Sequence, residues 1–149
     1  MSERHTVTTT LEFPYRRSLG TVVGRFMTAL KDGRILGARS AAGGVLVPPL
    51  EYDPATAEAV DPDLVEVGPG GVVTSWTWVA TPSSRHPLDH PFAFALIQLD
   101  GATTSIVHVL DTGSAEAVHT GLRVTPRWRE ERVGAITDIE AFVPEGASA

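Results

Sequence analysis

The apolar residues near the start of the chain recur with the spacing of an α-helix. After Ser18, a residue type that caps helices, they fall three or four positions apart. Gly33 follows, and glycine readily adopts the left-handed conformation that ends a helix. The pattern predicts an amphipathic helix over residues 18–33, preceded by a polar, Thr-rich arm over residues 1–17. The residues of the apolar stripe are Leu19, Val22, Val23, Phe26, Met27 and Leu30.

From residue 64 the pattern changes to short runs of β-branched and aromatic residues, bounded by Gly, Pro or Asp. Five or six short strands without long helices between them favour a Greek-key barrel of the OB-fold type over residues 64–145. The predicted fold class is therefore mostly β, with one N-terminal helix. The candidate strands are Leu64–Val67, Val72–Thr81, Phe92–Leu99, Ser105–Leu110, Leu122–Arg129 and Ala135–Phe142.

Residues 34–63, between the predicted helix and barrel, contain two shorter strand candidates, Ile35–Arg39 and Val45–Val47. Around this hairpin the chain keeps the outline of a zinc ribbon: an arginine, a glycine, a Pro-Pro pair and a further proline at the expected spacing. The framework residues are Arg39, Gly44, Pro48, Pro49 and Pro54.

The ligand positions of that outline hold no zinc ligands of the usual kind. They are Ser40, Gly43, Asp53 and Thr56, and the chain has no cysteine. Structural zinc takes nitrogen and sulfur donors, with only occasional carboxylates. We therefore expect a degenerate, metal-free ribbon hairpin and no cofactor.

The order of segments resembles a known family. The helix ending in Leu30–Gly37 and the ribbon outline are followed by Gly68–Thr77, Pro91–Asp100 and Gly121–Val124. This order resembles the acyl-CoA-associated OB-fold family with a rubredoxin-like zinc ribbon, also called domain of unknown function 35 (DUF35), in a cysteine-free variant. The resemblance covers roughly residues 13–145 and includes accessory subunits of thiolase-like steroid side-chain aldolases.

The resemblance implies a non-catalytic accessory subunit of a hetero-oligomer. Its partner would be a thiolase-like aldolase or thiolase acting on acyl-CoA or sterol side-chain CoA thioesters, with possible contact to the thioester at the interface. The chain by itself is then not expected to be an enzyme. The expected interface residues are Phe13, Tyr15, Gly20, Gly24, Phe26, Pro48, Pro49, Tyr52, Trp78 and Phe92.

Two alternatives remain open for parts of this interface. Gly20 and Gly24 are either tolerated weak positions, each costing about 1 kcal/mol relative to Ala, or a strip for close approach by a neighbouring subunit. The aromatic residues Trp78 and Phe92 are either core residues or part of an interface or ligand wall.

A third class of function would be an enzyme that uses the cluster His86, Asp89 and His90. Prolines at positions 87 and 91 exclude a helix that would place both histidines on one face, so a loop is expected. His108 lies within a strand candidate, where a structural histidine is the simpler interpretation. The chain has no nucleophile elbow, Walker loop or HExxH motif.

Composition restricts the partners further. The 149 residues carry a net charge of −6, which opposes general nucleic-acid binding, although an OB-fold with exposed aromatics keeps single-stranded nucleic acid as an alternative ligand. No apolar run approaches the roughly 20 residues of a membrane span, and the first residues do not resemble a signal peptide. The expected location is therefore the cytoplasm, without membrane contact.

Overall fold

The computed structural model describes residues 5–146, and the single α-helix of this part is α1 (Gly20–Lys31). It begins after Leu19, where the Ser18 hydroxyl accepts the N–H of Gly20 at 3.3 Å. At the other end the N–H groups of Asp32 and Gly33 donate to the carbonyls of Ala29 and Leu30, each at 3.0 Å. Of the apolar stripe predicted from the sequence, Phe26 and Leu30 are buried and Leu19 is exposed, while Ala29, which was not in the stripe, is buried beside them.

A small antiparallel sheet follows the helix. It contains β1 (Ile35–Arg39), β2 (Val45–Leu46) and β3 (Val65–Val67), with β1 in the centre. The strand candidate 64–67, which the sequence analysis placed in the barrel, instead pairs with β1 through Ile35↔Val67 and Gly37↔Val65. Alternating apolar residues identify a strand but not its neighbour. The barrel in the structure accordingly begins after this strand.

The barrel closes with the strand order β4-β5-β6-β8-β7, which is the Greek-key order of an OB-fold. Neighbouring strands are antiparallel except β6 and β8, which are parallel. The mostly β fold class with one N-terminal helix is thereby confirmed. The strands are β4 (Gly71–Val79), β5 (Phe92–Leu99), β6 (Ile106–Leu110), β7 (Arg123–Trp128) and β8 (Ile139–Pro144).

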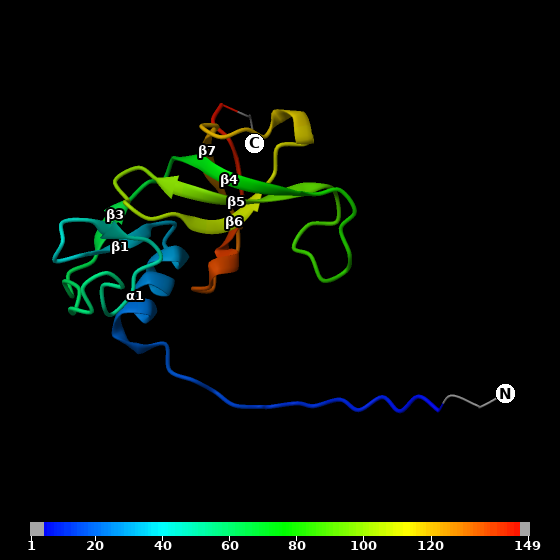
Figure 1. The fold of residues 1–149 in the computed structure, drawn as a ribbon, viewed down its shortest axis with the longest axis horizontal. Helices are drawn as coiled ribbons and strands as arrows, with labels where there is room; N and C mark the ends of the chain where they lie inside the picture. The colour runs from blue at the N-terminus through cyan, green and yellow to red at the C-terminus, as the bar shows by residue number, and fades with distance from the viewer. Residues whose placement is uncertain (1–4, 147–149) are drawn as a thin grey trace.

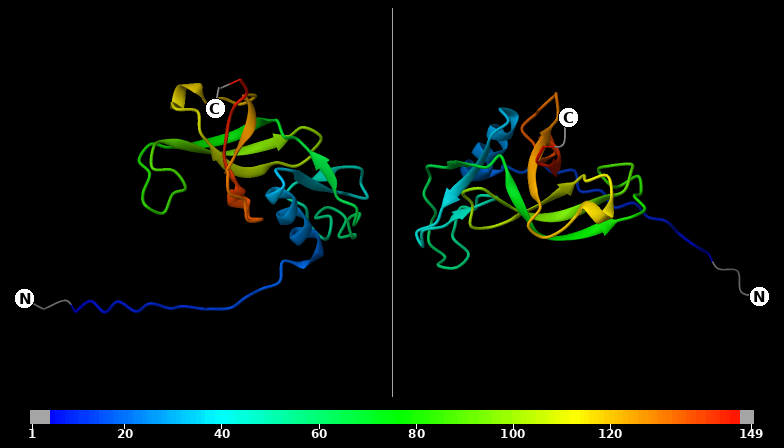
Figure 2. Two further views of the ribbon diagram at one scale, coloured as in Figure 1. Left: turned by 180° about the vertical axis from the view of Figure 1, so that it is seen from behind. Right: turned by 90° about the horizontal axis from the view of Figure 1, so that it is seen from above.

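One continuous core joins the helix, the small sheet and the barrel. Phe26 and Leu30 of α1 belong to the same buried cluster as Ile97, Ile139 and Phe142 of the barrel strands. In Figures 1 and 2 the helix and the small sheet lie together at one end of the barrel, and the loop that joins β4 to β5 lies at the opposite end. The segment before α1 extends away from both. No helix among residues 5–146 is long and apolar enough to span a membrane.

The candidate strand 135–142 is divided in the structure. Its first residues form the 3₁₀ turn η2 (Ile136–Asp138), and β8 begins at Ile139; a second 3₁₀ turn, η1 (Ala115–Ala117), lies between β6 and β7. The buried Asp138 carboxylate imposes the η2 turn, because it accepts the N–H groups of Val133, Gly134 and Ala135 at 2.7–3.1 Å. Although burial alone would raise the pKa of Asp138, these donors hold it below its usual value.

Substituting Asp138→Ala should leave three backbone donors without their acceptor. Each hydrogen bond to a charged group contributes roughly 1.5–3 kcal/mol, so we expect the free energy of unfolding to fall by at least about 2 kcal/mol. Urea denaturation would measure the change. Glu130→Ala, at an exposed position of the same loop, serves as the control. Equal stability of the two variants would show that Asp138 does not hold the turn.

Candidate functional site

The four positions that correspond to zinc ligands lie on two turns. In the first, between β1 and β2, the N–H of Ser40 donates to the Gly44 carbonyl at 2.8 Å and the N–H of Gly43 to the Ser40 carbonyl at 3.0 Å. In the second, the N–H of Asp53 donates to the Glu58 carbonyl and the N–H of Ala57 to the Asp53 carbonyl, both at 2.8 Å. Both turns are therefore closed by their own backbone.

A hydrogen bond between side chains joins the two turns. The Ser40 hydroxyl donates to Asp53 Oδ2, and both side chains are buried. Asp53 Oδ1 also accepts the N–H groups of Ala55 at 2.7 Å and Thr56 at 3.4 Å. The hydroxyl of Ser40 and these backbone donors lower the pKa of Asp53, so the carboxylate is ionised at neutral pH.

The Asp53 carboxylate thus accepts hydrogen bonds from the Ser40 hydroxyl and the Thr56 N–H. Gly43 contributes only its N–H, which donates to the Ser40 carbonyl. The sequence identified all four positions but not the bond between them. The likeness of the segment to a metal-free zinc ribbon remains a prediction.

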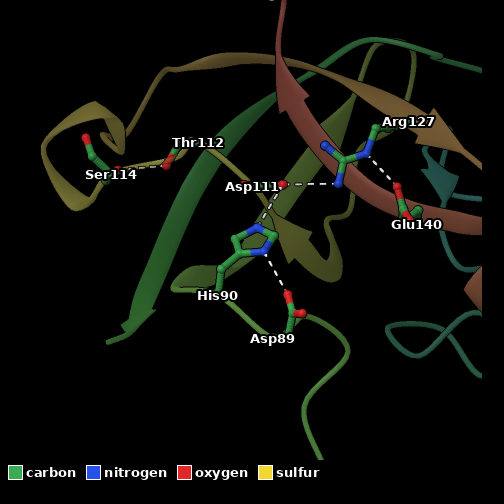
Figure 3. Close-up of polar contacts among 7 residues, drawn as sticks. All are labelled: Asp89, His90, Asp111, Thr112, Ser114, Arg127 and Glu140. Atoms are coloured by element: carbon green, nitrogen blue, oxygen red, sulfur yellow. Dashed lines mark hydrogen bonds and ion pairs between the residues drawn. The ribbon is translucent and has the colours of Figure 1, made fainter. Parts of the chain in front are cut away.

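A second polar cluster lies on the outside of the barrel (Figure 3). His90, in the loop before β5, has Nδ1 at 3.2 Å from Asp89 Oδ1 and Nε2 at 3.2 Å from Asp111 Oδ2. Arg127 of β7 then donates to Asp111 at 3.0 Å and to Glu140 of β8 at 2.6 Å. The sequence singled out Asp89 and His90 but missed the other members, because they come from separate segments and share no motif.

The two carboxylates determine what His90 can do. A carboxylate accepts hydrogen bonds, so the bonds that His90 donates to Asp89 and Asp111 favour the doubly protonated imidazolium and raise the pKa of His90. An imidazolium that donates from both nitrogens has no lone pair for abstracting a proton. No group of three or more His, Asp or Glu side chains within residues 5–146 is arranged to hold a metal ion. The cluster is therefore an ion-pair network between loop and barrel.

The other histidines of interest also have structural surroundings. His86 Nδ1 accepts the N–H of Ser83 at 2.8 Å, and its ring lies 5.7 Å from that of Phe92. His108 of β6 is buried, with Nε2 at 3.3 Å from the Ile136 carbonyl. Burial lowers the pKa of His108. The structure does not bring His86 and His90 into a common hydrogen-bonded site among the described residues.

The expected interface residues divide into three groups by exposure. Three of them lie in the interior and present no surface in this conformation: Phe26, Pro49 and Phe92. Phe26 and Phe92 are buried because their strand or helix positions face apolar clusters inside the chain. Two are partly buried, Gly24 and Trp78. The remaining five are exposed: Phe13, Tyr15, Gly20, Pro48 and Tyr52.

These features define an OB-fold protein with an N-terminal helix and a small accessory sheet. Residues 64–129 match the family described as ChsH2, C-terminal OB-fold domain. The chain is therefore similar to the OB-fold domain of that family over residues 64–129, and the resemblance to the DUF35 family that the sequence suggested is confirmed.

Solved structures share this fold. One, named Ltp2-ChsH2(DUF35) aldolase, is 24% identical in sequence with a TM-score of 0.62, covering 87% of this chain and 98% of that chain. Another, a DUF35 protein of unknown function from Sulfolobus solfataricus, is 20% identical with a TM-score of 0.58, covering 72% and 78%. Among proteins with curated descriptions, no sequence matches this chain.

The Ser40–Asp53 bond predicts a specific dependence of stability on pH. Because the folded-state pKa of Asp53 is lowered, its contribution is present above the unfolded-state pKa of about 3.9 and is lost as pH falls below that value. Asp53→Asn should therefore be less stable than the wild type at pH 7, and the difference should shrink in acid.

Urea denaturation from pH 7 to pH 3 would measure both proteins, with the exposed Asp63→Asn as control. A difference between wild type and Asp53→Asn that stays constant across this range would contradict an ionised, hydrogen-bonded Asp53.

The pKa values of His90 and His108 should be shifted in opposite directions from the ordinary value of histidine. We expect the NMR titration midpoint of His90 to lie above about 6.5 and that of His108 below it. The stabilisation from charged His90 is then fully present below about pH 6.5 and is lost as pH rises through the higher folded-state pKa. Asp111→Asn should move the His90 midpoint down. A His90 midpoint at or below 6.5 in the wild type would exclude the ion-pair network.

Proposed function

We propose that this chain is a non-catalytic accessory subunit that docks on a thiolase-like aldolase or thiolase acting on acyl-CoA or sterol side-chain CoA thioesters. The observation that carries the proposal is the similarity to the structure named Ltp2-ChsH2(DUF35) aldolase, which extends over 98% of that chain. The similarity covers 87% of this chain and therefore extends beyond the barrel. It supports a shared architecture for docking.

A continuous docking surface supports the same role. Gly20, at the start of α1, lies so close to Glu51 that a Cβ atom there would come within 2.6 Å of Glu51 Oε1. The start of the helix and the loop after Pro49 therefore lie side by side. Contiguous exposed apolar patches commonly mark protein interfaces. The exposed apolar residues of this docking surface are Leu19, Leu50 and Tyr52, and the arm that extends away from it carries the exposed Phe13 and Tyr15.

The outer side of α1 provides room for close approach. A Cβ atom built on Gly24 would meet no atom within 4 Å, so the chain itself does not need a glycine there for packing. An open groove runs past Gly20, Gly24 and Thr28, with Arg25 and Arg34 at its sides. These observations favour the interpretation that Gly24 admits a neighbouring subunit, whereas the positive φ of Gly20 (+74°) and its approach to Glu51 give that glycine a role within the chain.

The described residues provide little for the alternative functions. His90 is held between two carboxylates, which argues against its use as a catalytic base. Arg123 is paired with Asp100 and Glu145, and Arg127 with Asp111 and Glu140. These arginines are neutralised within the chain, and the net charge is −6, so a phosphate backbone would find little attraction. We therefore assign catalysis to the partner subunit.

Gly24→Leu tests the docking mode. Leucine favours helix and would project into open space, so we expect an unchanged melting temperature and at least tenfold weaker binding to the thiolase-like partner. Co-purification followed by calorimetric titration would measure binding. Lys31→Leu, at an exposed position of α1 outside the groove, is the matched control. Unchanged affinity in Gly24→Leu would remove the helix groove from the interface.

A further inference from the structure

The second half of strand β4 has a strand neighbour on one side only. The start of β4 pairs with β7 through Gly71↔Val124, and the N–H of Val73 still donates to the Leu122 carbonyl. From Thr74 to Val79, the only strand partner within residues 5–146 is β5. Backbone N–H and C=O groups point to both sides of a strand, so this half of β4 presents backbone groups without a strand partner on the side away from β5. We call that side of Thr74–Val79 the free edge.

The free edge has little of the protection that edge strands usually carry. Proteins prevent unwanted pairing at an edge with charged residues, prolines, bulges or a covering element. The sequence of β4, GVVTSWTWV, contains neither a charged residue nor a proline. Its bulge lies between Val73 and Ser75, before most of the free edge. The aromatic side chain of Trp76 is 39% exposed in the middle of this segment. The free edge therefore has the character of a strand that a further segment completes.

The arm before α1 has the pattern of such a segment. Its residues 5–17 belong to no helix or strand. Leu11, Phe13 and Tyr15 occupy every second position, as on one face of a β-strand, and each is 77–79% exposed. Residues 6–10 are threonine except for Val7, and both residue types favour strands. Pro14 is compatible with an outermost strand, where one side needs no donor. The arm is therefore patterned as a strand but has no strand partner in its own described chain.

The two faces of the arm match the two faces of the free edge. Trp76 lies opposite Ala95, a residue of the buried core cluster, and therefore faces the core side of the sheet. Alternation along the strand places Trp78 on the same side, and Ser75 and Thr77 on the outer side. A strand added beside β4 would place the apolar residues of the arm next to the tryptophans and its threonines next to Ser75 and Thr77. Agreement of this kind on both faces is what specifies the register of a strand.

A second copy of the chain can supply the arm more directly than the same copy can. Phe26 and Leu30 of α1 pack in the core cluster, which fixes where the arm begins. In Figure 1 and the left view of Figure 2 the arm leaves at the bottom, beyond α1, whereas β4 lies near the top of the barrel. The arm of the same copy would have to turn back around the barrel, but the arm of another copy can remain extended. Two copies related by a two-fold axis can exchange their arms reciprocally.

We propose that the free edge of β4 binds the arm of a second copy of this chain as an added β-strand, in a dimer that exchanges both arms. Backbone hydrogen bonds supply the affinity in this mode of recognition, and alternate side chains supply the specificity. The inference does not rest on the proposed function, because it requires no enzyme partner. It assigns Phe13 and Tyr15, which the sequence placed at a partner interface, to the contact between two copies of this chain.

Sedimentation analysis of two matched variants tests the dimer. We expect the wild type to dimerise with a Kd at or below about 100 μM. Phe13→Asp changes a 77% exposed side chain, so the melting temperature should stay the same while dimerisation weakens at least tenfold. Val133→Asp introduces the same charge at a 70% exposed position of the β7–β8 loop and should dimerise like the wild type. A wild type that stays monomeric at about 1 mM, or equal dimerisation of the two variants, would overturn the proposal.

A paramagnetic label identifies the segment that occupies the free edge. The chain has no cysteine, so Thr8→Cys provides a single attachment point for a nitroxide on the arm. This labelled protein, without ¹⁵N, is mixed with ¹⁵N-labelled wild type. Only an arm from another copy can then broaden the amide signals of Ser75, Trp76 and Thr77, and reduction of the nitroxide with ascorbate should restore them.

The other possible occupants give different results. A dimer without this broadening would mean that β4 pairs with another segment, such as β4 of the second copy, and would overturn the assignment of the arm. Broadening that occurs only when the nitroxide and ¹⁵N are in the same chain would mean that the chain folds back its own arm, and would overturn the exchange. Gly24→Leu, which tests docking on an enzyme, should leave dimerisation unchanged, so the two proposals can fail independently.

Discussion

The hydrogen bond from Ser40 to the buried Asp53 carboxylate holds together the segment between the helix and the barrel. The chain has no cysteine for a disulfide, and this bond joins two turns through residues that are 13 positions apart. Once joined, they fix the loop that carries Leu50 and Tyr52 beside the start of α1. The proposed docking surface therefore depends on an ionised carboxylate, and a change that protonates Asp53 weakens the bond that supports it.

Charge pairing is the second constraint on the molecule. Arginine supplies nearly all the positive charge, and two arginines of the described residues, Arg123 and Arg127, contact two carboxylates each. Arg123 forms bidentate hydrogen bonds with Asp100 at 2.7 Å and also reaches Glu145. These groups lie at the surface, where ion pairs contribute little to stability. Their main effect is that Arg123 and Arg127 are each neutralised within the chain.

Sequence periodicity predicted most of the elements. The stripe around Phe26 predicted α1, and the runs of apolar residues predicted every barrel strand to within a few residues. The pattern could not predict partners, and so β3 was assigned to the barrel although it pairs with β1. It also could not reveal η2, because the turn depends on one aspartate that accepts three backbone donors.

The sites were harder to predict, because the sequence pattern does not show which distant residues become neighbours. The sequence left Phe92 open between the core and an interface, and the structure buries it in a cluster against which Leu88 of the β4–β5 loop packs. The cluster around His90 assembles residues that are more than 20 positions apart.

The shared core also sets the order in which the molecule can be completed during synthesis. Phe26 and Leu30, near the beginning of the chain, pack in one cluster with Ile139 and Phe142 of the last strand. β8 lies between β6 and β7, so the barrel cannot close until that strand has left the ribosome. Contacts so distant in sequence form late in folding. The helix that carries the proposed docking surface is synthesised before the barrel but thus gains its final support only when the last strand is in place.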